Sequence, residues 1–292
     1  MTAAALSAPR SASPTWQRFR DAFRRHPTAI IGGIVLALMV LVALLAPWLG
    51  TVDPQALSPA QRLKPPSSEH WFGTDMLGRD VYSRVVYGAR ISLTVGIAVA
   101  ALSVAIGLAI GLVTGFVRWL DAIVMRIMDG LMSIPSVLLA IALMALTKAS
   151  VGNVIVAITV AEVPRVVRLV RGLVLSLREQ PFVEAAIAAG TTLPLILTRH
   201  ILPNTVAPLL VQGTYICASA MIVEAILSFI GAGTPPNIPS WGNIMAEARS
   251  LFQIAGYLIF FPGLFLSLTV LAVNLLGDGM RDALDPRLAR RM

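Results

Sequence analysis

Long uncharged apolar runs constrain this chain more than any other feature of its sequence. No charged residue occurs from Ala29 to Leu49 or from Ile91 to Val117. At 1.5 Å per helical residue, each run can cross a hydrocarbon core about 30 Å thick. Backbone N–H and C=O groups in lipid must be paired within their own segment, so both runs predict membrane-spanning helices.

Four further segments extend this pattern and predict an all-α membrane protein with six transmembrane helices. They are Gly130–Thr147 (with a start nearer Ile123), Val151–Leu173, Val206–Ile230 and Ile254–Leu276. The second of these new segments, Val151–Leu173, is the least regular, because Glu162, Arg165, Arg168 and Arg171 interrupt it. Only 13% of the 292 residues are charged, where a soluble domain carries roughly 25%.

The distribution of lysine and arginine predicts the orientation. With the N-terminus inside, sixteen of these residues fall in cytoplasmic segments and seven in outer ones, as the positive-inside rule requires. We therefore expect both termini in the cytoplasm, and we assign the +8 net charge to topology rather than to nucleic-acid binding. The expected organisation is an N-terminal tail (1–28), a first helix (29–49), an extracytoplasmic segment (50–90), a five-helix core (91–278) and a C-terminal tail (279–292).

A loop at 182–204, between the fourth and fifth predicted spans, carries the clearest motif. Its small residues allow another surface to approach closely, and Gly190 permits a bend. Thr191 or Thr192 can cap a second short helix, with Pro194 in its first turn. An amphipathic helix lying on the bilayer fits the composition equally well. It does not explain Glu-Ala-Ala, Gly and Ile-Leu-Pro at fixed offsets between two spans.

The loop resembles the "EAA loop" of binding-protein-dependent ABC importer permeases. Within that group, the chain is similar to the "C" subunit of the oligopeptide/dipeptide/nickel family over about residues 16–290. The supporting motifs are His70–Arg84 (HWFGTDMLGRDVYSR), Ser228–Gly231, Pro235-Pro236, Ser240–Gly242 and Gly277–Arg287. Pro194 departs from the family pattern, which more often has an aromatic or charged residue there.

This resemblance implies a type I ABC importer permease fold with cytoplasmic coupling helices, in the bacterial plasma membrane. The implied function is inward transport of di- or oligopeptides or a related small solute. Implied partners are a homologous permease, ABC ATPase subunits that bind ATP and Mg, an extracytoplasmic solute-binding protein and membrane lipid. The implied docking residues for the ATPase are Glu184, Ala185, Ala186, Gly190, Ile201 and Pro203.

Residues within the predicted spans suggest packing and pathway roles. Gly107, Gly111 and Gly115 form a smooth strip that predicts close packing, either within the permease or against a paired one. Glu224 is a candidate gate or pathway residue. The favoured interpretation is a structural role near the gate, in which the carboxylate of Glu224 lies at the helix end and accepts hydrogen bonds from the following turn. Glu162 and Arg165 are one turn apart and could pair near the cytoplasmic end of their span.

An alternating-charge patch precedes the second predicted span. It contains Asp75, Arg79, Asp80 and Arg84. We interpret this patch either as a surface element whose charges satisfy one another or as a contact for the binding protein. The three histidines are scattered, so no metal site is predicted.

The absence of several catalytic motifs from the sequence limits the reactions expected of this chain. The chain has no GxxxxGK[ST] phosphate loop, so ATP hydrolysis is expected on partner subunits and no cofactor is expected on this chain. HExxH and GxSxG are also absent, and no enzyme activity is predicted. A self-sufficient secondary transporter is the alternative, with Glu224, Glu162 and Arg165 as its candidate coupling residues.

Overall fold

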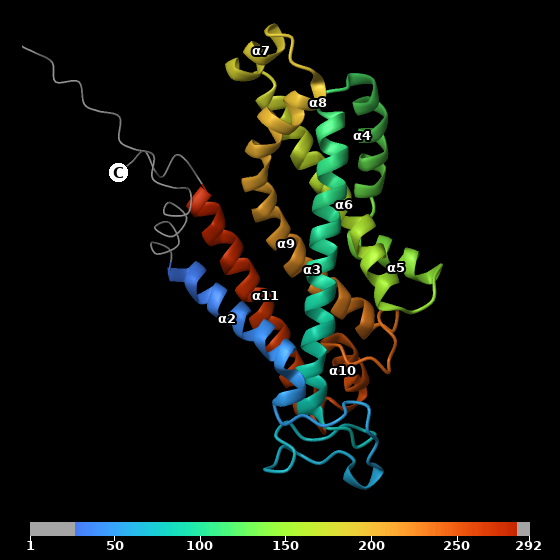
Figure 1. The fold of residues 1–292 in the computed structure, drawn as a ribbon. Helices are drawn as coiled ribbons and strands as arrows, with labels where there is room; N and C mark the ends of the chain where they lie inside the picture. Colours follow the sequence, from blue (N-terminus) through green and yellow to red (C-terminus); the bar gives the residue numbers. More distant parts are fainter. Residues whose placement is uncertain (1–26, 285–292) are drawn as a thin grey trace, which may run out of the picture.

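A computed structural model describes residues 27–284 of the chain, and Figure 1 shows its helices. The predicted N-terminal tail lies outside the described residues except for residues 27–28, and the first six residues of the predicted C-terminal tail, 279–284, belong to α11. The helices are α2 (Pro27–Leu45), α3 (Val81–Thr114), α4 (Arg118–Met132), α5 (Ser136–Ala145), α6 (Val151–Leu177), α7 (Pro181–Ala188), α8 (Leu193–Leu195), α9 (Leu202–Phe229), α10 (Trp241–Glu247) and α11 (Tyr257–Leu284).

Helix α3 forms the axis of the bundle. Its 34 residues make it about 50 Å long, so it extends beyond a hydrocarbon core. It packs against α6 and α9, while α11 packs against α2 and α9. The helix begins at Val81, well before the uncharged run at Ile91, because Asp80 caps its first turn and the nearby arginines are held in internal contacts.

The glycine strip of α3 lies against α6 within this chain. A Cβ atom added at Gly107, Gly111 or Gly115 would lie within 2.6 Å of the Cβ of Val166, Val170 or Val174, respectively. From one contact to the next, the residue number increases by four on both helices, so α3 and α6 run parallel in a fixed register. These three glycine–valine contacts allow the two backbones to approach closely.

The predicted third span is not one straight helix. Helices α4 and α5 meet at 89° across Ser133, Ile134 and Pro135. Pro135 has no N–H to continue the hydrogen-bond ladder and disfavours helical backbone at the residue before it. The sequence prediction followed hydropathy and overlooked this break.

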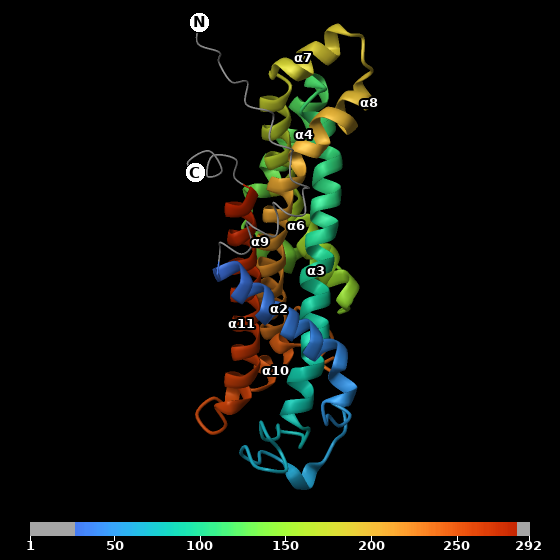
Figure 2. The same ribbon diagram turned by 60° about the vertical axis from the view of Figure 1, so that its left-hand side comes forward.

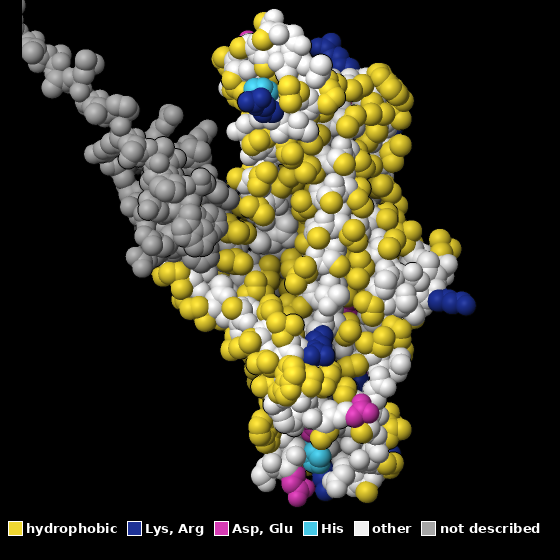
Figure 3. All heavy atoms as spheres, viewed as in Figure 1, with side chains coloured by type: hydrophobic (Ala, Val, Ile, Leu, Met, Phe, Trp, Pro, Cys, Tyr) yellow, Lys and Arg dark blue, Asp and Glu magenta, His cyan; other side chains and the backbone are white. Residues whose placement is uncertain are grey.

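Four helical segments among the described residues are long and apolar enough to cross a membrane, or five if α4 and α5 together form one bent span. Helix α6 has the length of a span, but four charged residues lie between positions 162 and 171. The expected count of six therefore stays a prediction. Figure 3 shows a broad band of hydrophobic side chains along one face of the molecule.

The two ends of the bundle are built differently. Helices α7 and α8 and the start of α4 lie at one end, while residues 50–80 lie at the other, with α10 toward that side (Figures 1 and 2). We call these the α7 end and the α10 end. Because α3 connects them, any membrane crossed by α3 separates the two ends.

Candidate functional site

Helix α7 begins the loop at 182–204, which we call the docking loop. Pro181 occupies the start of the helix, where its missing N–H costs nothing. Val183 is fully buried in the main hydrophobic core with Val174 and Ile201. One side of this short helix is therefore fixed to the bundle.

Gly190 ends the first limb of the docking loop. Its φ of +76° lies in the left-handed region that side chains rarely adopt. Its N–H donates to the carbonyl of Ile187 at 2.9 Å, and the N–H of Thr191 donates to that of Ala186 at 3.0 Å. These bonds close the helix end, and the space around Gly190 is open.

The second limb is a short α8 followed by a π-helical turn over Ile196–Ile201. Pro194 lies in the first turn, as predicted. Thr192 precedes the helix, but its hydroxyl makes no capping hydrogen bond, so the expected side-chain cap is absent. Ile196 and Ile201 are buried and hold this limb to the core.

The docking residues predicted from the family divide into two groups. Glu184, Ala185, Gly190 and Pro203 are exposed at the α7 end, and Ala186 is half-buried, whereas Ile201 has no exposed surface. Ile201 can therefore anchor the loop but cannot touch another subunit in this conformation. Two exposed apolar side chains, Phe182 and Ile187, were missed by the sequence reasoning; an apolar residue on either side of Glu-Ala-Ala was the available signal.

At the α10 end, Asp75, Arg79 and Arg84 form an ion cluster with Glu247, which we call the outer ion cluster. Arg79 Nε donates to Asp75 Oδ2 at 2.6 Å, and Arg84 Nη1 donates to the same oxygen at 2.5 Å. Arg84 Nη2 reaches Glu247 Oε1 at 3.0 Å, and Arg79 Nη2 also donates to Glu247. The cluster therefore joins the segment before α3 to α10.

The outer ion cluster is internal. Arg84 is 1% exposed and Asp75 is 4% exposed, so these side chains satisfy one another rather than face solvent. Burial favours the neutral carboxyl of Asp75. The backbone N–H of Arg79 and the two guanidinium charges outweigh burial and hold the pKa of Asp75 below its ordinary value of 3.8. Glu247 was not predicted, because no local motif links it to residues so distant in the sequence.

Asp80 has a different role from its neighbours. Its Oδ2 accepts hydrogen bonds from the backbone N–H of Ser83 at 2.8 Å and from the Ser83 hydroxyl at 2.7 Å. The other carboxylate oxygen lies 3.2 Å from His70 Nδ1. Asp80 is therefore the N-cap of α3.

Glu224 is fully buried near the α10 end of α9. Its carboxylate accepts hydrogen bonds from the hydroxyls of Ser228 at 2.9 Å and Ser92 at 3.4 Å. The Ser228 hydroxyl also contacts Thr234 in the turn after α9. This arrangement matches the predicted carboxylate bonded to the following turn, and it ties α9 to α3.

The sequence profile of the family described as "Binding-protein-dependent transport system inner membrane component" matches residues 103–290. The chain belongs to this family. A second profile, the "N-terminal TM domain of oligopeptide transport permease C", matches residues 14–66. The protein is thus an ABC transporter permease subunit of the inner membrane, as the motifs predicted.

Curated relatives agree with this assignment. The permease is 57% identical over 268 residues to the "Probable peptide ABC transporter permease protein y4tQ" of Sinorhizobium fredii, covering 92% of each chain. It is 40% identical to the "Dipeptide transport system permease protein DppC" of Alkalihalophilus pseudofirmus, covering 94% of this chain and 90% of that one. It is 47% identical to the "Glutathione transport system permease protein GsiD" of Salmonella paratyphi A, covering 94% and 89%.

The fold resembles a solved transporter structure. A structure titled "Inward facing conformations of the MetNI methionine ABC transporter" matches with a TM-score of 0.57 and 22% identity, covering 71% of this permease and 95% of that chain. At this identity the similarity concerns the fold alone.

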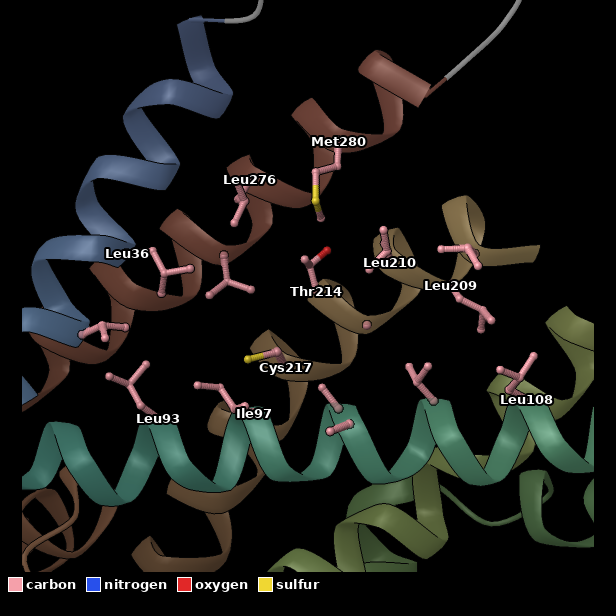
Figure 4. A pocket seen from close by; sticks show the side chains of 17 residues that line it. Leu36, Leu93, Ile97, Leu108, Leu209, Leu210, Thr214, Cys217, Leu276 and Met280 are labelled. Carbon is pink, nitrogen blue, oxygen red and sulfur yellow. The ribbon is translucent and has the colours of Figure 1, made fainter. Parts of the chain in front are cut away.

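An apolar groove of about 510 Å³ lies between α2, α3, α9 and α11 (Figure 4). Leu93, Ile97 and Leu108 line it from α3, and Leu276 and Met280 line it from α11. Thr214 contributes a hydroxyl, which donates to the carbonyl of Val211 at 2.7 Å. None of the lining residues is charged, so the groove does not suit the charged end of a polar solute.

Proposed function

We propose that this chain forms half of the solute pathway of an ATP-driven importer, paired with a homologous permease. Two ATPase subunits dock at the α7 end and hold ATP and Mg. A solute-binding protein docks at the α10 end and delivers the solute. The chain itself does not hydrolyse ATP.

The docking loop carries this proposal. Its exposed surface is fixed to α6 through Val183 and leads directly into α9 through the buried Ile201. A displacement of α7 by a moving ATPase would therefore be transmitted to two long helices rather than absorbed by the loop. The outward-facing small residues Ala185 and Gly190 suit close contact with another protein surface.

The topology we propose has six spans, with the α7 end in the cytoplasm. The bent pair α4–α5 would be the third span, and α6 would be the fourth. Its charged residues would then face a pathway or another subunit rather than lipid. The excess of lysine and arginine in the segments assigned to the cytoplasm supports this orientation and puts both termini inside.

We infer a peptide or a similarly small polar molecule as the solute, because relatives over nearly the whole chain are named as peptide, dipeptide and glutathione permeases. For the binding protein, we propose contact with the exposed side chains beside the outer ion cluster, which include Trp71 and Leu77. Asp75, Arg79 and Arg84 would fix the shape of that surface from beneath.

Site-specific cross-linking tests the docking proposal. A photoreactive residue at Ala185 should capture the ATPase subunit in native membranes, and the same residue at Leu271, an exposed position on α11, should not. Capture should be lost in a Gly190→Arg background and kept with Gly190→Asn, because Asn tolerates a positive φ. Equal capture at Ala185 with and without Gly190→Arg would contradict the assignment.

A further inference from the structure

Helix α6 carries exposed cations on a surface that no described part of the chain covers. The side chains of Arg165 and Arg168 are 53% and 51% exposed. Arg168 Nη2 lies 2.6 Å from Oδ1 of Asp129, which is exposed as well. A guanidinium at the centre of a bilayer is costly to insert, so lipid is an unfavourable neighbour for this surface.

The register between α3 and α6 gives the depth of these cations. The contacts from Gly107–Val166 to Gly115–Val174 put Ser103 level with Glu162 and Ile106 level with Arg165. Ile106 lies near the middle of the uncharged run from Ile91 to Val117. We therefore expect Arg165 at the depth of the hydrocarbon core, deeper than the cytoplasmic end of the span, where the sequence predicted the Glu162–Arg165 pair.

Three buried polar atoms near the level of Glu162 form no hydrogen bond within the described residues. Glu162 is 1% exposed, and its Oε2 forms an ion pair with Arg165 Nη1 at 3.2 Å, without the geometry of a hydrogen bond. The hydroxyls of Ser103 and Thr159 are also buried without a partner. Buried polar groups are normally satisfied by protein or by ordered water, so this part of the bundle carries unused hydrogen-bonding capacity.

We propose that the α6 surface around Arg165 lines an aqueous section of the solute pathway, and that Arg165 binds an anionic group, such as a carboxylate, of the passing solute. Glu162 acts as a positioning residue that orients the guanidinium from within the bundle. A guanidinium suits this role because its planar fork matches a carboxylate with two parallel hydrogen bonds. This inference rests on the proposed function, because the second permease completes the walls of the pathway.

Thiol labelling of the assembled transporter tests the aqueous lining. Cys217, the single cysteine of the sequence, is first replaced with alanine so that it cannot react. In this background, Arg165→Cys is compared with Leu271→Cys, which is similarly exposed but lies on α11. A membrane-impermeant thiol reagent added from the α7 side should label position 165 faster by about tenfold or more, because each unit by which lipid raises a thiol pKa removes roughly nine-tenths of the reactive thiolate. Equal, slow labelling at both positions would overturn the proposal.

Nucleotide dependence separates a pathway position from a headgroup position. Labelling at position 165 should fall when ATP is trapped on a hydrolysis-deficient ATPase, because closure of the ATPases shuts the inner half of the pathway. Unchanged labelling at position 165 in the trapped complex would overturn the pathway assignment. Failure of the ATPase to assemble with the chain would instead contradict the proposed function itself.

Thiol reagents of opposite charge test whether this section of the solute pathway prefers anions. A sulfonate-bearing and a trimethylammonium-bearing thiol reagent are compared at Arg168→Cys, one turn from Arg165. Replacing Arg165 with Gln should lower the anionic-to-cationic rate ratio by about fivefold or more, the effect of about 1 kcal/mol of charge interaction at close range. Arg165→Lys should restore much of the ratio. If Arg165→Gln leaves the anionic-to-cationic rate ratio unchanged, the proposed anion site at Arg165 is contradicted.

Discussion

At the scale of single residues, the space around the Cα atom determines whether a glycine is needed for helix packing. Gly111 faces Val170 so closely that an added Cβ would lie 2.6 Å from the valine Cβ and 3.0 Å from the carbonyl oxygen of Val167. Gly172 on α6 has open space around its Cα. The same amino acid is therefore a packing requirement at one position and dispensable at the other.

Gly111→Ala and Gly172→Ala should accordingly change stability in opposite directions. The first overpacks the contact between α3 and α6 and should cost about 1–3 kcal/mol. The second removes a flexible residue from a helix interior and should be neutral or stabilising by up to about 1 kcal/mol. Thermal unfolding in detergent measures both variants. Similar melting temperatures for the two would show that the glycine strip does not hold α3 against α6.

The outer ion cluster predicts how stability depends on pH. Because folding lowers the pKa of Asp75, the unfolded state binds its proton more tightly. The stabilisation is present above about pH 4, the ordinary range of an aspartate, and is lost as the pH falls through the folded pKa. Asp75→Asn should lower the melting temperature at pH 7, and it should make the melting temperature less dependent on pH in the acidic range. Asp53→Asn, in the same segment but exposed, is the control. Parallel curves for wild type and Asp75→Asn would contradict the role given to Asp75.

At the scale of the elements, local signals define helix ends better than hydropathy does. Asp80 and Ser83 define the start of α3 at Val81, although the uncharged run begins only at Ile91. Asp80→Ala should cost about 1 kcal/mol, the usual value of an N-cap, and Asp80→Asn should cost much less. Amide hydrogen exchange at Ser83 and the melting temperature test this pair. Equal losses with Ala and Asn would show that capping is not what Asp80 contributes.

Sequence reasoning found the long helices and the docking loop, because both depend on local pattern. It overlooked the bend at Pro135, since hydropathy averages over a single proline. It also expected the charged residues around the start of α3 to satisfy one another at the surface; they do pair, but Asp75 and Arg84 are buried. The partner of the two arginines, Glu247, lies far along the chain, and burial by distant residues leaves no local signal. The depth proposed for Arg165 likewise depends on the register between α3 and α6, for which the sequence has no local signal.

At the scale of the whole molecule, the two ends are suited to different neighbours. The α7 end presents small and apolar residues on a helix fixed to α6 and α9. The α10 end presents a loop held in shape by buried ion pairs. Between them, α6 carries the exposed side chains of Arg165 and Arg168, for which we propose a second subunit and water as neighbours. The chain is thus built to work as one part of a larger assembly.

The most direct test of that central claim is gentle detergent extraction of the tagged chain from its native membrane, followed by mass spectrometry of the proteins that remain bound. The account predicts a second permease and an ABC ATPase in the purified complex, with ATP hydrolysis that the chain alone does not show. A stable, monodisperse chain recovered without partners, and able to accumulate solute from an ion gradient in vesicles, would contradict it and favour a self-sufficient secondary transporter.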